Sequence, residues 1–400
     1  MPSPQKILVF AHTPPPHHGQ SYMVELMLKG LGGDWHQRIR SGKTSALPED
    51  RHGIRCFHVN VRLSDDLEEV GSTQPKKILR LLKYVVQAVW FRFRYQIDTL
   101  YYVPAPAKLS AIIRDGIVML LVRPFFKRVV FHWHAFGLGE WVKSNESDPD
   151  WKKGLTKYLL SNVDTSIVLT NYNASDARIF CPKSIALVSN GIPDPCPDFN
   201  ERVLPERRRR MAGGQSARAC KVLYLAHCIR EKGLFDTLEA VRLANGGRSD
   251  SKFYLTVAGG FMNDEERRIF DRDVRAIREE LGFLCVRHVG FLSGDEKFRA
   301  LEEHDILCFP TYYSGEALPV NIVEAMAFGL PVVTTRWRGI PEVLPNDWQY
   351  LVDPQKPKEI AHALIQAREF DQFEKLRQTY RDRFSIDIHI ENLAKALKEY

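Results

Sequence analysis

The sequence lacks the signatures of several classes of protein. None of its seven cysteines forms a Cys-x-x-Cys pair and their number is odd, which indicates neither a zinc site nor a disulfide framework and favours a reducing compartment. No uninterrupted apolar run reaches the length of about 18 residues that a membrane-spanning helix needs. The apolar part of the N-terminal PQKILVFAHTPPP is too short for a signal peptide, and no internal repeat is present. We therefore expect a cytoplasmic protein without a spanning segment.

The composition is that of a large globular protein. Hydrophobic residues make up 44% of the 400 residues, and a chain of this length is expected to form two domains. The net charge of +7 leaves open a solvated basic surface, an anionic substrate or an acidic membrane face. The basic run Arg207 to Arg210 has no interleaved aromatic residues and belongs to no recognisable nucleic-acid module, so no nucleic-acid partner is predicted.

Short apolar runs alternate with helix-length segments along the chain. Such runs are typical of parallel sheets that are covered on both faces. They predict strands at 6–11, 57–62, 99–105, 129–135, 165–170, 184–191, 221–227, 253–260, 285–291, 305–310 and 331–335. The runs fall into two series, which predicts an α/β protein of two doubly wound domains facing across a cleft. Ligands of such sheets bind beyond the carboxyl ends of the strands.

A change of composition near the middle of the chain predicts the domain boundary. Residues 194–219 hold three prolines, Gly213-Gly214 and the run of four arginines, which is typical of a linker. We predict an N-terminal, acceptor-side domain over 1–195, a linker over 196–219 and a C-terminal, nucleotide-sugar-binding domain over 220–382.

The stretch SGEALPVNIVEAMAFGLPVVTT, residues 314–335, combines two carboxylates with the start of a helix. Glu316 follows a predicted strand, Pro319 suits the first helical turn, and Gly329 suits the position after the helix. Free amides at the helix start favour an anion such as phosphate, and carboxylates accept hydrogen bonds from sugar hydroxyls. A phosphate site between Glu316 and Glu324 fits a sugar nucleotide. The alternative is that Glu324 only interacts with the helix dipole.

The same stretch resembles the donor-site signature of a known family. GEALPVNIVEAMAFGLPVVTTRWRGIPEVL is similar to that of the retaining glycosyltransferases of family 4 (glycosyl transferases group 1), which have the GT-B fold. YLAHCIREKGLFDTLEA, LTVAGG, VRHVGFLSGDE and DILCFPTYYSGE resemble other C-terminal segments of the family, in the family's order. LTNYNASDA, ALVSNGIPDP and AHTPPPHHGQSYMV resemble N-terminal ones. RFSIDIHIENLAKALKEY resembles the closing helix, which implies that 383–400 crosses back to the N-terminal domain.

The resemblance implies roles for individual residues. Glu324 would hold the ribose hydroxyls and Glu316 the hydroxyls of the transferred sugar. Lys232 with Arg230 would neutralise the diphosphate, because the leaving group gains negative charge in the transition state. Further contacts with the donor or acceptor are implied for Ala317, Leu318, Pro319, Gly290, Phe291, Gly19 and His134. No Asp-x-Asp motif is present, so we expect no metal and no cofactor, with a UDP- or GDP-sugar as the donor.

Several of these assignments have alternatives. His227 stands where the family often has arginine, which weakens the role of Arg230, and Ala317 stands where glycine is common. His132 and His134 share one face of a strand, and His132 is as readily a core histidine. Lys232 is alternatively a surface lysine, Gly290-Phe291 an ordinary strand end and Gly19 a plain turn.

The segment KKILRLLKYVVQAVWFRFRYQI, residues 76–97, has six basic residues and no acidic one. Lys76, Arg80, Lys83, Gln87 and Arg94 fall on one side of a helix. A basic amphipathic helix can lie on an anionic membrane surface. The alternative is a helix that covers the N-terminal sheet and exposes one solvated stripe.

Together these observations predict a retaining, metal-independent glycosyltransferase. It would move a hexose-type sugar from a nucleotide-sugar donor to a hydroxyl of a glycan, lipid-linked or small-molecule acceptor, in the synthesis of a cell-surface polysaccharide or glycolipid. The implied mechanism is same-face attack assisted by the departing diphosphate. The alternatives are a sugar-phosphate synthase or phosphorylase of the same fold, and a catalytically inactive sugar-nucleotide-binding or assembly protein.

Overall fold

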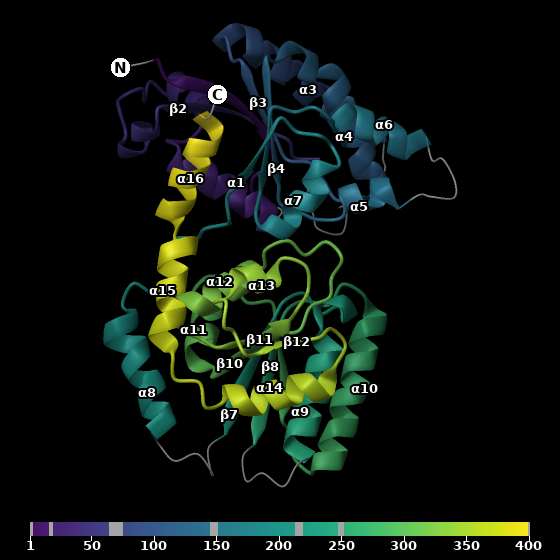
Figure 1. Ribbon diagram of the computed structural model, residues 1–400, viewed down its shortest axis with the longest axis vertical. Coiled ribbons are helices and arrows are strands. Elements are labelled where there is room, and N and C mark those ends of the chain that lie inside the picture. The colour runs from purple at the N-terminus through teal and green to yellow at the C-terminus, as the bar shows by residue number, and fades with distance from the viewer. Residues whose placement is uncertain are drawn as a thin grey trace. The chain divides into compact units, whose positions relative to one another are not determined.

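The computed structural model describes residues 3–15, 19–63, 75–144, 151–212, 219–246 and 252–398. The chain forms two compact units, one made of Met1–Gly191 with Ile386–Tyr400 and one made of Ile192–Ser385. Each unit is built on a six-stranded parallel sheet that is flanked by helices (Figure 1). Among the described residues, no helix is long and apolar enough to cross a membrane.

The sheet of the first unit has the strand order β2-β1-β3-β4-β5-β6. Its strands are β1 (Gln5–Ala11), β2 (Ile54–Asn60), β3 (Thr99–Tyr102), β4 (Arg128–Trp133), β5 (Thr165–Val168) and β6 (Ser184–Leu187). Its helices are α1 (Gly19–Gly30), α2 (Trp35–Arg40), α3 (Pro75–Tyr95), α4 (Leu109–Leu121), α5 (Leu138–Lys143), α6 (Trp151–Leu160), α7 (Asn171–Arg178) and α16 (Ile386–Lys398), with the short η1 (Pro48–His52) and η2 (Arg123–Phe125).

Alternation along β1 explains the two cores of this unit. Ile7 and Val9 pack in one core with α1 and α16, whereas Leu8 and Phe10 pack in another with α3, α4 and α6. Helices α1 and α16 approach each other closely, because a Cβ atom added at Gly30 would meet the side chain of Ile390 at 2.5 Å. The C-terminal helix therefore belongs to the first unit (Figure 1).

The sheet of the second unit has the order β12-β11-β10-β7-β8-β9, a doubly wound order in which β7 and β10 flank the topological switch point. Its strands are β7 (Cys220–Leu225), β8 (Phe253–Ala258), β9 (Val286–Gly290), β10 (Ile306–Phe309), β11 (Val332–Thr335) and β12 (Leu351–Val352). Its helices are α8 (Leu204–Ala212), α9 (Leu234–Gly246), α10 (Asp264–Leu281), α11 (Gly294–Glu303), α12 (Val320–Ala327), α13 (Ile340–Val343), α14 (Pro357–Ala367) and α15 (Phe373–Phe384), with η3 (Phe199–Val203) and η4 (Arg230–Lys232).

The strands β1 to β11 confirm the eleven strands predicted from the apolar runs, with ends shifted by a few residues. β12 was not predicted, because two residues carry no periodic pattern. The segment 196–219 was predicted to be a linker, but its described part forms η3 and α8 within the second unit. Composition is misleading here because Arg207 is buried, and its guanidinium donates hydrogen bonds to the carbonyls of Leu301, His304 and Phe328 at 2.8–2.9 Å.

A buried histidine of the second unit makes its stability depend on pH. His304 is bonded through Nδ1 to the Ala300 carbonyl at 2.6 Å and through Nε2 to the Thr256 hydroxyl at 2.9 Å. Burial lowers the pKa of His304 to about 4. The unfolded chain takes up this proton near pH 6.5, so it binds more protons than the folded protein between pH 6.5 and 4.

We therefore expect the free energy of unfolding to fall as the pH drops from 6.5 to 4, with a contribution of roughly 3 kcal/mol from His304. Urea titrations over this range would measure the slope. In His304→Gln the slope should be shallower than in the wild type by up to about one proton. Equal slopes in the two proteins would mean that His304 does not titrate in this way.

Candidate active site

Two of the predicted donor-site residues, Lys232 and Glu316, meet at the topological switch point of the second unit. The loop after β7 carries Lys232, and the loop after β10 carries Glu316. β7 and β10 are adjacent parallel strands, so their carboxyl ends lie side by side. The ammonium of Lys232 and the carboxylate of Glu316 form an ion pair, with 2.5 Å between Nζ and Oε2.

This ion pair is largely buried. The side chains of Lys232 and Glu316 are 17% and 10% exposed. The ammonium lies 4.7 Å from the ring centroid of Tyr313, and the Thr311 hydroxyl donates to Glu316 Oε2 at 3.4 Å. A buried pair adds little net stability, because the desolvation of both charges offsets their attraction. Its effect is to hold a cation and an acceptor ready at the end of the sheet.

A glycine allows the two loops to meet. Gly233 follows η4 with a φ of +81°, and a Cβ atom there would meet the carbonyl oxygen of Pro310 at 2.4 Å. Only glycine fits both the left-handed conformation and this contact. Gly233 thus sets the position of Lys232 against the loop that carries Glu316.

Helix α12 follows that loop. The N-cap of α12 is Pro319, so this residue precedes the helix. The prediction that Pro319 lies in the first turn was therefore wrong by one position. Gly329 has a φ of +59° one residue after the C-cap, which confirms the predicted helix end. Ala317 and Leu318 are buried just before the helix. The start of α12 thus lies directly after Glu316 in the same loop.

Glu324 is buried within α12 and pairs with Lys297 of α11. Burial raises the pKa of Glu324, although the Lys297 ammonium acts in the opposite direction. Two carboxylate–lysine pairs thus flank the start of α12 in the sequence. Glu316, which pairs with Lys232, precedes it, and Glu324, which pairs with Lys297, follows it. Sequence reasoning missed Lys297, because a partner 27 residues away on another helix leaves no periodic signal.

A second missed residue is Asn321. Its amide nitrogen donates to the Leu225 carbonyl at 2.8 Å, which ties α12 to the end of β7. Its Oδ1 atom is buried and has no hydrogen-bond partner among the described residues. A buried acceptor without a donor costs free energy, so this atom is suited to a hydroxyl or N–H donor of a ligand.

The structure places Arg230 differently from Lys232. The Arg230 guanidinium lies 4.6 Å over the ring of Phe235, and its backbone N–H donates to Glu266 at 2.8 Å. The neighbouring His227 is exposed, and its carbonyl accepts a hydrogen bond from Tyr224. The described contacts therefore bring Lys232, and not Arg230, to Glu316.

The predicted base-facing residues lie at the end of the edge strand β9. Gly290 has a φ of +77° and its carbonyl accepts a hydrogen bond from the Gly259 N–H at 2.8 Å. Phe291 follows with a side chain that is 67% exposed. An exposed aromatic ring at the carboxyl end of the sheet is suited to stacking, and the roles of Gly290 and Phe291 stay predictions.

His134 and Gly19 belong to the first unit. The ring centroids of His132 and His134 lie 4.1 Å apart, so the two side chains lie on the same side of the chain, although His134 is one residue beyond the end of β4. His132 is a core residue bonded to Tyr101 at 2.6 Å, and burial holds its pKa well below the ordinary value. Gly19 begins α1, and a Cβ atom there would have no neighbour within 4 Å. Among the described residues, no packing contact therefore requires glycine at position 19.

Comparisons with known proteins agree with this geometry. Residues 219–369 match the family described as glycosyl transferases group 1. The amylovoran biosynthesis glycosyltransferase AmsK of Erwinia amylovora is 28% identical over 149 residues, which is 36% of this chain and 35% of AmsK. The match thus spans about a third of that relative. Together the family match and this relative support a glycosyltransferase.

Solved structures match nearly the whole chain. Sucrose-phosphate synthase from Thermosynechococcus elongatus has a TM-score of 0.66 at 17% identity and covers 98% of both chains. Anabaena Alr3699/HepE in complex with UDP-glucose has a TM-score of 0.62 at 15% identity, covering 98% of this chain and 99% of its own. These likenesses confirm the predicted fold, the GT-B arrangement of two α/β units. Among the described residues no cluster of His, Cys, Asp and Glu could hold a metal ion.

Gly233→Ala should test how strictly the site is built. The added methyl group would force Lys232 away from Glu316, and we expect a loss of about 1–3 kcal/mol in the free energy of unfolding. Gly282→Ala is the matched control, since Gly282 has a φ of +75° but no atom within 4 Å of an added Cβ. Urea unfolding of both variants would check this. A Gly233→Ala cost no larger than that of Gly282→Ala would contradict the role given to the contact with Pro310.

Proposed function

We propose that the protein is a retaining, metal-independent glycosyltransferase that moves a hexose-type sugar from a nucleotide sugar to a hydroxyl group. The observation that carries the proposal is the buried Lys232–Glu316 ion pair at the topological switch point, directly before α12. Segment 219–369, which matches group 1 glycosyltransferases, contains this pair, Glu324 and Asn321. A UDP- or GDP-sugar is the proposed donor, in keeping with the UDP-glucose bound by HepE.

In this proposal each residue of the site binds a different part of the donor. The diphosphate takes the place of Glu316 as the counterion of Lys232, and the amides before α12 donate to it. Glu316 is then released to accept a hydroxyl of the transferred sugar, and Glu324, with Asn321 Oδ1 beside it in α12, accepts ribose hydroxyls. Lys232 stabilises the leaving diphosphate, which assists deprotonation of the acceptor hydroxyl on the same face. We assign an acceptor or sugar contact to His134, and donor contacts to Gly19, Gly290 and Phe291.

The acceptor is proposed to be a glycan or a lipid-linked sugar, in the synthesis of a cell-surface polysaccharide or glycolipid. A relative that is named for amylovoran biosynthesis supports this direction. The likeness to sucrose-phosphate synthase keeps a sugar phosphate as the second candidate acceptor.

Glu316→Gln and Lys232→Ala should each lower turnover of the nucleotide sugar by about 100-fold or more, because each removes a charge placed for the transition state. Transfer, and hydrolysis of the donor without acceptor, would be measured by release of the nucleoside diphosphate. Lys358→Ala, which removes an exposed lysine of α14, is the control and should keep full activity. Folding would be checked by circular dichroism.

The base of the nucleotide donor can be identified with the wild type and the Lys232→Ala variant. At 100 times its dissociation constant a ligand adds about 2.7 kcal/mol to stability, so UDP, GDP and ADP can be ranked by thermal unfolding. Lys232→Ala should lose this stabilisation. Wild-type turnover in either site variant would refute the assignment. Nucleotide binding without any turnover in the wild type would favour an inactive sugar-nucleotide-binding protein.

We also propose that residues 76–97 make peripheral contact with an anionic membrane, at its cytoplasmic face. The helix α3 has a buried side formed by Leu81, Val85, Ala88 and Phe91. A second side exposes large apolar residues to solvent, namely Leu79, Leu82, Val86, Trp90 and Phe93. The adjacent basic side carries Arg80, Lys83 and Arg94, while the side chain of Lys76 lies outside the described residues. A helix that only covers the sheet needs one apolar side, and α3 has two.

Arg80→Glu/Lys83→Glu should weaken binding to anionic vesicles by roughly 30-fold or more, since each basic residue near such a surface contributes about 1 kcal/mol. Co-sedimentation with phosphatidylserine vesicles would measure this, with phosphatidylcholine vesicles as the neutral reference. The control is Arg40→Glu on α2, an exposed arginine of the same unit. Unchanged binding of the α3 variant would end the proposal.

A further inference from the structure

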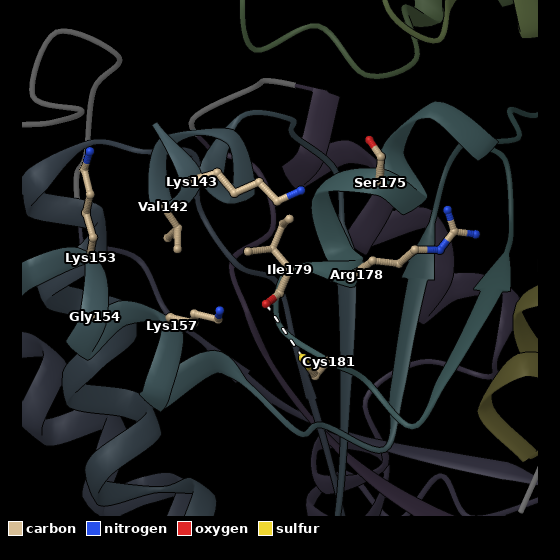
Figure 2. A pocket seen from close by; sticks show the side chains of 9 residues that line it. All are labelled: Val142, Lys143, Lys153, Gly154, Lys157, Ser175, Arg178, Ile179 and Cys181. Carbon is tan, nitrogen blue, oxygen red and sulfur yellow. Dashed lines mark hydrogen bonds between the residues drawn. The ribbon is translucent and has the colours of Figure 1, made fainter. Parts of the chain in front are cut away.

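A basic pocket lies in the first unit, apart from the residues assigned to the donor. Its volume is about 610 Å³, and it is bounded by α5, α6 and α7 with the turn after α7. Four cationic side chains line it, namely Lys143, Lys153, Lys157 and Arg178. Figure 2 shows Lys143 and Lys157 reaching from their helices toward Ile179, with Arg178 on the far side. No carboxylate is among the described residues that line it.

The charges of this pocket are not balanced by the protein that the structure describes. Lys153 donates to the hydroxyl of Ser144 at 3.0 Å, and no described carboxylate pairs with Lys143, Lys157 or Arg178. Lys153 and Lys157 are four residues apart on α6, where like charges repel each other. The helix dipoles of α5 and α7 favour a cation at each C-terminal end, where Lys143 and Arg178 lie. The dipoles do not explain why four cationic side chains line the same pocket. An anion would explain it.

The helix that supplies two of these cations also has an exposed apolar side. Trp151 and Tyr158 are 71% and 79% exposed, and Leu155 between them is exposed as well. These residues are spaced i, i+4 and i+7, so they share one side of α6. Lys153, Gly154 and Lys157 lie on the adjacent side and line the pocket. The anion site therefore borders an apolar stripe.

Helix α4, the neighbour of α6, also exposes apolar side chains. A Cβ atom at Gly116 would lie 3.6 Å from Leu159, so the two helices are in close contact. The end of α4 exposes Leu120 and Leu121. In Figure 1 the helices α3, α4 and α6 follow one another along the same side of the first unit. More than half of the exposed large hydrophobic side chains of the described residues lie on α3, α4, η2 and α6.

We propose that this pocket binds the phosphate of an anionic lipid whose acyl chains lie against the apolar side of α6. The chemistry required is a phosphate ester joined to an apolar body, because cations and apolar side chains stand on adjacent sides of one helix. Ser175 lines the same pocket, and its hydroxyl donates to the Tyr172 carbonyl at 2.7 Å, so the four cations and not this hydroxyl would hold the phosphate. The inference extends the membrane contact proposed for α3 and does not depend on the transfer reaction.

The test compares lipid and soluble phosphate on the full chain. Vesicles of phosphatidylcholine with phosphatidic acid, vesicles of phosphatidylcholine alone, and glycerol 3-phosphate in solution would be titrated. We expect tight binding to the phosphatidic acid vesicles and weak binding to the other two. Lys157→Ala/Arg178→Ala should lower affinity for the phosphatidic acid vesicles by roughly 30-fold. A blue shift of Trp151 fluorescence, measured as the difference from Trp151→Phe, should accompany binding.

The matched control removes one exposed lysine and one exposed arginine elsewhere in the same unit, Lys43→Ala/Arg40→Ala. An equal loss of affinity in this control would overturn the proposal, because the effect would then be one of overall charge. Equal binding to neutral and phosphatidic acid vesicles, or unchanged binding of Lys157→Ala/Arg178→Ala, would also overturn it. Binding of glycerol 3-phosphate as tight as that of the lipid would replace the lipid with a soluble phosphate. Loss of vesicle binding with unchanged transfer to a soluble acceptor would separate this site from the proposed activity.

Discussion

The candidate site depends on one constraint, which is that a buried charge must have a counterion. Lys232 and Glu316 reach each other only because β7 and β10 are adjacent and parallel, and because Gly233 lets their loops touch. In the protein without a ligand each charge neutralises the other, so the desolvated loops keep their shape. In the proposed function, a diphosphate and a sugar hydroxyl would supply the same two interactions from the ligand. Such a ligand could therefore bind without leaving Lys232 or Glu316 buried and unpaired.

The same requirement for a counterion applies to helix α12, which carries Glu324. Glu324 is held by Lys297, and the C-terminal carbonyls of α12 are bound by two buried arginines. Arg207 donates to the Phe328 carbonyl, and Arg377 donates to that of Ala327 at 2.9 Å. Cations at this end of a helix are favourable, because the dipole is negative there. Through Arg207, the segment 192–212 therefore supports the C-terminal end of the proposed donor helix.

The fold was predictable because its signals are local, and parts of the site were not because theirs are spatial. Strand positions follow from apolar runs, and Gly329 follows from the rule for helix ends. Glu316 and Lys232 were found through loop position and resemblance to a family. Lys297 and Asn321 escaped, since nothing in GDEKFRALEE or VNIVEAMA shows which side chains will face each other. The burial of Arg207 was missed for the same reason. A run of arginines in the sequence does not show which of them will bind backbone carbonyls inside the protein.

Helices α3 and α6 show that a helical pattern of apolar and basic residues predicts a helix but not which of its apolar residues are buried. The sequence of α3 shows apolar and basic residues at helical spacing, but it cannot say which apolar residues will be covered by the sheet. The structure divides them, since Leu81 and Phe91 are buried while Val86 and Trp90 face solvent. A helix with one apolar side is accounted for once it packs on a core. Two apolar sides on α3, with a further exposed stripe on α6 beside lysines that have no carboxylate partner among the described residues, exceed what folding of this unit requires. This excess is the observation on which the proposed membrane contact rests, and the adjacent cations are the reason that an anionic surface is proposed.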